Sequence, residues 1–267
     1  MERIRRQYVD AGTGQLHLRA LASDGDAVHA PLLCLPPAPS SGLYFTTVMP
    51  LLNHGRRVYA ADYPGYGGSD PVSGEPTIPD YAEAMLRVAA TVGAPVDVLG
   101  FHTGCLVGAE MALCGPASVR RLVLCDVPFF DADKRNALLA KMAQPLPIST
   151  ELHCLAGAWA FDVESRVGSV ALDRAFELFV EHLRAGADDF RAFAAAFRYD
   201  CVSRFAELDV DAVVLATRSS LREPSHAAAA AIDCARLVDV DEVTTAVFEA
   251  GAQEIARAVI AALEDGQ

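Results

Sequence analysis

Two side chains suited to acid–base chemistry follow short apolar segments of the sequence. His102 lies in GFHTG (100–104), between the apolar segment PVDVLG (95–100) and a run of small and apolar residues at 103–113. Asp126 ends another apolar segment, RRLVLCD (120–126). An imidazole changes its charge near neutral pH and can act as a general base, or in principle as a nucleophile. The sequence therefore makes His102 the first candidate for a reacting group and Asp126 a candidate carboxylate.

The other residues with reactive chemistry fit structural roles better. Cys105 lies one helical turn after His102, where we expect it to face the packing side of a helix, and Cys34 and Cys125 alternate into the core of their strands. Asp62 is predicted to bind backbone N–H groups in a turn, because the loop PGYGGSD that follows it lacks the GxxxxGK[ST] spacing of a phosphate loop. The sequence has no HxH or HExxH motif, so we predict no metal and no other cofactor.

Short apolar strands and helices alternate along the regions that hold these residues. The first 30 residues predict a β-hairpin around Gly12-Thr13-Gly14. Six further strands are predicted at 31–37, 56–62, 95–100, 120–126, 211–217 and 236–240. Helices are predicted at 42–53, 79–91, 103–113, 224–234 and 249–264. This alternation predicts an α/β fold with a mostly parallel, eight-stranded sheet and helices on both of its faces.

Between Val127 and about Leu208 the alternation stops, and only helical patterns occur, at 131–143, 149–160, 169–185 and 187–199. We interpret residues 128–207 as an inserted helical cap, and residues 1–127 and 208–267 as one discontinuous core domain. The cap contains an aromatic-rich set at helical spacing, which would form its own core. Alternatively some members, Trp159 among them, face a cleft and line an apolar substrate pocket.

Composition limits the classes of protein and partner. The chain has 267 residues, of which 52% are hydrophobic and 21% charged, and this composition excludes a disordered chain. Its net charge of −13 repels phosphate backbones and anionic lipids, so we predict neither nucleic acid nor a membrane as a partner. The N-terminus has no apolar stretch typical of a signal peptide. Seven cysteines without a CxxC pair favour reduced thiols and a cytoplasmic location.

Several motifs together resemble the alpha/beta-hydrolase superfamily. GFHTG (100–104) stands where that family carries its G-x-S-x-G nucleophile elbow, a tight turn from strand to helix. LCLPPAPSS (33–41) resembles the oxyanion-hole segment, and DYPGYGGSD (62–70) resembles the loop after the fourth strand. The cap falls after the sixth strand, as in many members. The resemblance covers nearly the whole chain and implies the alpha/beta-hydrolase fold.

The sequence departs from the family at each position of the usual triad. His102 replaces the nucleophilic serine, so an acyl-serine intermediate cannot form there. The usual acid position falls in ATRSSLREP (216–224), which has Glu223 several residues late, and the usual histidine position falls at or near Thr244. A conventional Ser-His-Asp mechanism is therefore disfavoured.

A dyad of His102 and Asp126 is the substitute that we predict. In the family's sheet order the strands before His102 and Asp126 are neighbours, which would bring the carboxylate near the ring and raise its pKa. The resemblance also implies that the N–H groups of Ala38 and Thr103 form an oxyanion hole. The predicted activity is hydrolysis of a small carbonyl compound, such as an ester, lactone or diketone, with His102 as the general base.

Two other classes of function remain open at this stage. The protein could be a catalytically degenerate relative that only binds a small molecule, because a histidine is often just a satisfied polar group. It could also be an interaction module. The oligomeric state is open, with a homodimer as one alternative.

Overall fold

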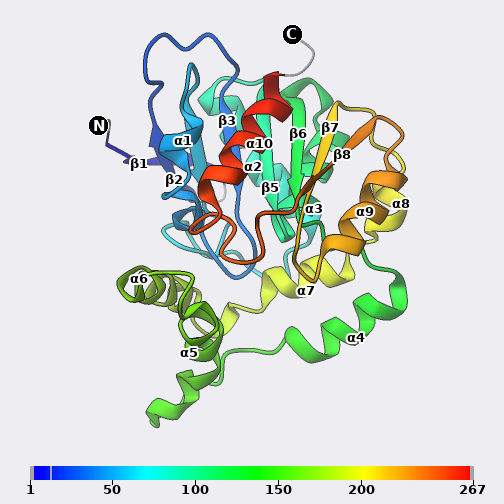
Figure 1. Ribbon diagram of the computed structural model, residues 1–267. Coiled ribbons are helices and arrows are strands. Elements are labelled where there is room, and N and C mark those ends of the chain that lie inside the picture. Colours follow the sequence, from blue (N-terminus) through cyan, green and yellow to red (C-terminus); the bar gives the residue numbers. More distant parts are fainter. Residues whose placement is uncertain (1–2, 13, 265–267) are drawn as a thin grey trace.

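The computed structural model describes residues 3–12 and 14–264 and contains an eight-stranded sheet. The strand order is β1-β2-β4-β3-β5-β6-β7-β8; β1–β2 and β2–β4 are antiparallel pairs and the remaining pairs are parallel (Figure 1). The strands are β1 (Arg5–Asp10), β2 (Gln15–Leu21), β3 (Leu32–Leu35), β4 (Val58–Ala61), β5 (Val96–Phe101), β6 (Val119–Cys125), β7 (Ala212–Thr217) and β8 (Ala235–Val240). The predicted fold class and the adjacency of β5 and β6 are confirmed.

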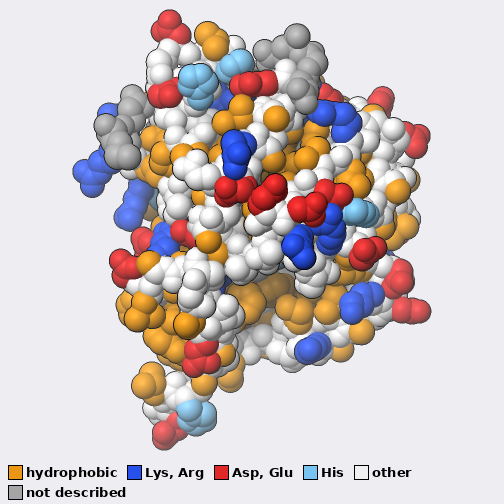
Figure 2. Space-filling model, viewed as in Figure 1, with side chains coloured by type: hydrophobic (Ala, Val, Ile, Leu, Met, Phe, Trp, Pro, Cys, Tyr) orange, Lys and Arg blue, Asp and Glu red, His pale blue; other side chains and the backbone are white. Residues whose placement is uncertain are grey.

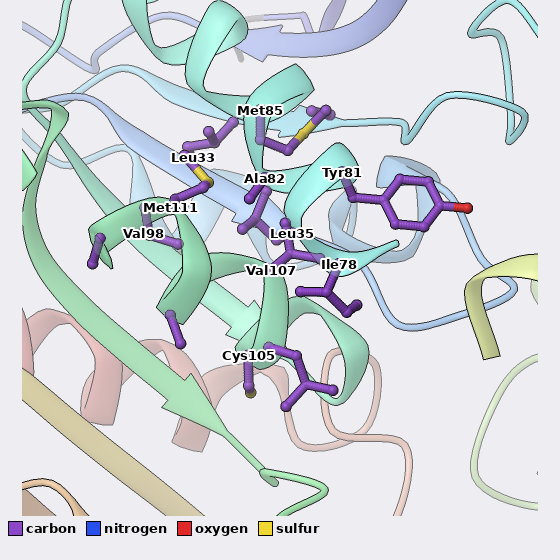
Figure 3. Close-up of a cluster of buried hydrophobic side chains, with 14 of the residues drawn as sticks. Leu33, Leu35, Ile78, Tyr81, Ala82, Met85, Val98, Cys105, Val107 and Met111 are labelled. Atoms are coloured by element: carbon purple, nitrogen blue, oxygen red, sulfur yellow. The ribbon is translucent and has the colours of Figure 1, made fainter. Parts of the chain in front are cut away.

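Helices cover both faces of this sheet, which explains why its central strands β3 to β7 are buried at nearly every position. One face packs against α2 (Ile78–Val92), α3 (Thr103–Cys114) and α9 (Arg222–Ala231), and the other against α1 (Met49–Leu52) and α10 (Ala252–Glu264). Along β3, Leu33 and Leu35 face the first layer, whereas Leu32 and Cys34 face the second. Figure 3 shows part of the first layer, where strand and helix side chains interdigitate.

One predicted helix, 42–53, is divided in the structure. A 3₁₀ helix, η1 (Gly42–Phe45), begins where the Ser41 side chain accepts a hydrogen bond from the N–H of Leu43. The α1 helix starts separately, with Pro50 in its first turn. The β-branched pair Thr46-Thr47 lies between them and favours a helix less than straight-chain residues do.

The segment between β6 and β7 (residues 126–211, the β6–β7 segment) is helical throughout its regular parts. It contains α4 (Ala132–Met142), η3 (Leu152–Leu155), α5 (Ala156–Asp162), η4 (Glu164–Arg166), α6 (Leu172–His182), η5 (Leu183–Asp188), α7 (Arg191–Arg198) and α8 (Cys201–Phe205). The predicted helix at 149–160 is shortened, because residues 143–151, which include Pro145 and Pro147, are irregular. The predicted helix at 169–185 is also shortened, to 172–182, and η5 follows it with Gly186 at φ 61°. Figure 1 shows α4 to α7 below the sheet, on the side where α3 begins.

Ion pairs join the β6–β7 segment to the sheet region. Arg174 Nε of α6 lies 2.9 Å from Glu249 Oε1, and Glu181 Oε1 accepts hydrogen bonds from Arg19 Nη2 at 2.8 Å and Ser41 Oγ at 2.6 Å. These pairs are mostly buried, so α6 is held at a defined position over η1.

No helix among residues 3–12 and 14–264 is long and apolar enough to cross a membrane.

Candidate active site

His102 occupies a sharp turn between β5 and α3. Its φ of 49° and ψ of −113° lie in a region that non-glycine residues rarely adopt. The flanking glycines make the turn feasible: a Cβ on Gly100 would lie 2.5 Å from the carbonyl oxygen of Gly104, and a Cβ on Gly104 would lie 2.0 Å from that of Leu35. The turn therefore has the strained geometry that the elbow motif predicts.

Aromatic stacking orients the His102 ring. It lies against the Phe101 ring with centroids 3.9 Å apart and planes inclined by 30°. Phe101 in turn stacks on Tyr44 at 5.7 Å and meets the edge of Phe248 at 5.0 Å. His102 is partly exposed, whereas Phe101 and Phe248 are buried. The ring thus rests on a buried aromatic column and keeps one side accessible.

The protonation of His102 differs from the prediction. Burial in an apolar environment lowers the pKa of His102 to about 4, although the negative charge of Asp126 acts in the opposite direction. We predicted that Asp126 would raise this pKa; loss of hydration outweighs its charge. His102 is consequently a neutral imidazole at physiological pH.

Asp126 binds the end of the neighbouring strand. It is fully buried with φ 52°, and its Oδ1 and Oδ2 accept hydrogen bonds from the Thr217 N–H at 2.9 Å and the Thr217 hydroxyl at 2.7 Å. Within the described ranges, no hydrogen bond joins His102 to Asp126. The dyad stays a prediction, and in this structure Asp126 acts on the ring through its charge.

The two predicted oxyanion-hole residues lie beside the elbow. Thr103 is the first residue of α3 and is buried, as is Ala38 in the segment after β3. Gly104 lets that segment approach α3 closely, because a side chain there would collide with Leu35. No acceptor in the described part of the chain binds the N–H of Ala38 or Thr103. Both donors are available to a ligand, and their catalytic role stays a prediction.

A cavity of about 310 Å³ lies between the β6–β7 segment and Pro39, the residue after Ala38. Its apolar wall includes Met142, Leu146, Phe161, Phe190 and Phe193. Figure 2 shows a hollow with hydrophobic side chains in this region of the molecule. A larger cavity of about 390 Å³ is lined by residues of the β1–β2 hairpin, the loop after β4 and α2. Neither lining includes a residue of the elbow, but the smaller cavity includes Pro39, the neighbour of Ala38, and is therefore the better candidate for a substrate cleft.

Trp159, the predicted pocket residue, lies behind the wall of this cavity. Its ring packs edge-on against Phe179 at 5.3 Å and Phe176 at 6.3 Å, within a small core of the β6–β7 segment. Its neighbours Ala158 and Phe161 line the cavity instead. A pocket role for Trp159 stays a prediction.

Four ionisable side chains form a chain of alternating charges at one end of the cavity. Asp162 Oδ1 lies 3.4 Å from Arg166 Nη1, and Asp162 Oδ2 lies 2.5 Å from His182 Nδ1; His182 Nε2 lies 3.1 Å from Asp189 Oδ2. Burial lowers the pKa of His182, but hydrogen bonds to the two carboxylates outweigh this and raise it to about 9. His182 is therefore a buried imidazolium at neutral pH.

This cluster was not predicted from the sequence. Its members are separated by up to 27 residues, from Asp162 to Asp189, and lie in α5, η4, α6 and the turn before α7, which are brought together only by tertiary packing. The sequence places His182 on the last turn of a strongly amphipathic helix. This pattern predicts that the side chain is buried, but not which residues it contacts.

The remaining candidates have the structural roles that we predicted. The Cys105 thiol is buried and donates to the carbonyl oxygens of Gly100 at 3.3 Å and Cys125 at 3.2 Å, and burial raises its pKa. Asp62 accepts hydrogen bonds from the backbone N–H groups of Gly42 and Gly68, each at 2.8 Å.

Comparisons with known proteins agree with this architecture. A model of the alpha/beta hydrolase fold family matches residues 30–144. No curated protein sequence matches the chain. A hydrolase from Pseudomonas aeruginosa is 20% identical with a TM-score of 0.77, covering 97% of this chain and 98% of its own. E-2-(acetamidomethylene)succinate hydrolase is 19% identical with a TM-score of 0.77, covering 99% and 100%. The enol-lactonase of Burkholderia xenovorans is 18% identical with a TM-score of 0.74, covering 97% and 100%.

The strand order, the elbow and these comparisons lead to one conclusion: the chain has the alpha/beta-hydrolase fold.

Proposed function

We propose that this protein hydrolyses a small carbonyl compound, such as an ester, a lactone or a diketone, with His102 as the general base. The observation that supports this most is the elbow: it presents a neutral imidazole beside two backbone N–H groups, of Ala38 and Thr103, that no acceptor of the described chain binds. The similarity in fold to an esterase and to an enol-lactonase also supports a hydrolytic reaction.

The proposed reaction begins with a water molecule between His102 and the substrate. As the water oxygen attacks the carbonyl carbon, one of its protons passes to the free nitrogen of His102. The carbonyl oxygen becomes an oxyanion, which the N–H groups of Ala38 and Thr103 stabilise. When the tetrahedral intermediate collapses, the leaving alkoxide or enolate takes the proton from His102. A base whose pKa is about 4 attracts the proton weakly, so we expect slow turnover and a preference for activated substrates.

The proposal retains residues 128–207 as a helical cap over the site. The cavity beside Pro39 supports this division, because all its other lining residues belong to the β6–β7 segment. All seven cysteines are unpaired, which supports the predicted cytoplasmic location.

The test is hydrolysis of 4-nitrophenyl acetate and of a small lactone by the wild type and by His102→Gln. We expect the variant to lose at least about 100-fold in kcat/KM. The same substitution at His153, an exposed histidine of η3, is the matched control and should leave the rate unchanged. Wild-type kcat/KM should be flat from about pH 8 to pH 5 and decline toward pH 4, because the base must be neutral. Undiminished activity of His102→Gln would overturn the proposal, as would fluorophosphonate labelling that one Ser→Ala change abolishes.

One observation favours a second candidate, a non-catalytic binding protein of the same fold. Asp126 binds Thr217 through both of its oxygens, and no carboxylate of the described residues forms a hydrogen bond with the His102 ring to hold it in a reactive tautomer. The same assay separates the two candidates, since a binding protein would show no turnover above the His102→Gln background.

A further inference from the structure

The cavity between Pro39 and the β6–β7 segment has walls that suit a compact apolar group. Three phenyl rings, of Phe161, Phe190 and Phe193, line it together with aliphatic side chains and prolines. At about 310 Å³ it is at the lower end of the range for small-molecule pockets. An inserted ring or branched chain would lose its hydration and make dispersion contacts on several sides.

The polar end of the cavity is balanced within the protein. Of the four groups in the alternating chain, His182 and Asp189 line the cavity, and Arg166 and Asp162 stand behind them. With His182 protonated, two positive and two negative charges cancel. Both ring nitrogens of His182 face carboxylate oxygens, so no donor remains for a ligand anion. Gln144, the other polar residue of the wall, is uncharged.

A charged substrate group would find no partner here. The charged group would lose its hydration on entering the cleft. Each charged side chain of the alternating chain is already paired with an oppositely charged side chain at closer range, so the lost hydration would not be compensated. We propose that this cleft selects uncharged, mainly apolar substrates, and that Asp189 sets this selectivity by completing the charge balance. The inference rests on the proposed function in one respect only, namely that the non-reacting part of the substrate lies in this cleft.

Asp189 is the member of the chain that is best suited to a test. Its Oδ2 faces His182, and its Oδ1 is buried without a hydrogen-bond partner among the described residues, so His182 is the one charge that compensates it. Asp189→Asn keeps the shape of the side chain and removes one negative charge. The remaining groups then sum to one positive charge beside the cavity, which would attract a carboxylate.

The experiment measures binding by calorimetry at pH 6, where His182 is protonated. Three probes share a phenylalkyl skeleton: 4-phenyl-2-butanone, 3-phenylpropionate and 3-phenylpropylammonium. We expect the wild type to bind the ketone at least about tenfold more tightly than either ion. Asp189→Asn should bind 3-phenylpropionate about fivefold or more tightly than the wild type does, and should change ketone binding less than about twofold. Asp188→Asn, the same change at an exposed neighbour, is the control and should behave as the wild type.

The proposal is overturned if either ion binds the wild type as tightly as the ketone, if the ketone does not bind, or if Asp189→Asn leaves the preference unchanged. It is also overturned if Asp188→Asn shifts the preference equally. None of the probes has a hydrolysable bond, so the result does not depend on catalysis by His102. Loss or retention of hydrolysis in His102→Gln tests the proposed function separately.

Discussion

The buried imidazolium of His182 makes a quantitative prediction for the stability of the protein. Its pKa is raised from 6.5 to about 9 by Asp162 and Asp189. When folding raises the pKa of a group, the protonated group stabilises the folded state. This stabilisation is complete at pH values below the pKa of the unfolded state, and it is lost as the pH rises through the pKa of the folded state. Each pH unit corresponds to about 1.4 kcal/mol, so about 3 kcal/mol should disappear between pH 6.5 and pH 9.

The measurement is urea unfolding of the wild type and of His182→Gln at several pH values from 6 to 10. Other titrating groups are common to both proteins, so the difference in their unfolding free energies isolates His182. That difference should fall by about 3 kcal/mol across the interval and be constant at either end. His153→Gln, at an exposed position of η3, controls for the loss of a histidine as such. A difference that does not vary with pH would refute the reasoning, because it would mean that folding does not favour the protonated ring.

Two further predictions concern the elbow and the strand end beside it. Gly104→Ala should destabilise the protein by about 3 kcal/mol or more in thermal unfolding, because its Cβ would lie 2.0 Å from the Leu35 carbonyl oxygen. The control is Gly157→Ala in α5, whose Cβ would meet no atom within 4 Å and which should stabilise the protein by about 0.5–1 kcal/mol. Equal effects of the two substitutions would contradict the elbow geometry. Thr217→Val removes the hydroxyl that binds buried Asp126 and should cost about 1–3 kcal/mol in urea unfolding, and a change below about 0.5 kcal/mol would show that this hydrogen bond is dispensable.

The parts of the fold that follow from local patterns could be predicted. Strands that are buried on both faces are continuous apolar runs, and β5 and β6 are neighbours because sequential parallel strands usually pair through a short crossover. The glycines of GFHTG indicated a tight turn, and the φ of His102 and the close approach of Leu35 agree with that expectation.

The electrostatics of the site could not be predicted, because they depend on burial and on contacts between distant segments. The direction of the His102 pKa shift is set by how much water surrounds the ring, which a sequence motif does not specify. Asp126 could be placed at a strand end, but its partner Thr217 is determined by the register between β6 and β7. His182 meets Asp162 and Asp189 only after α5, α6 and the turn before α7 have packed together.

The elbow also has an evolutionary consequence. Its backbone conformation is imposed by β5, α3 and the two flanking glycines. Any non-glycine residue at position 102 has the same backbone strain of about 1–3 kcal/mol, whatever its side chain. A change of residue at position 102 therefore alters the group presented to a ligand with little change in foldability. A lineage can exchange a serine for a histidine at this position through a few nucleotide substitutions, and natural selection then acts on the new chemistry while the scaffold persists.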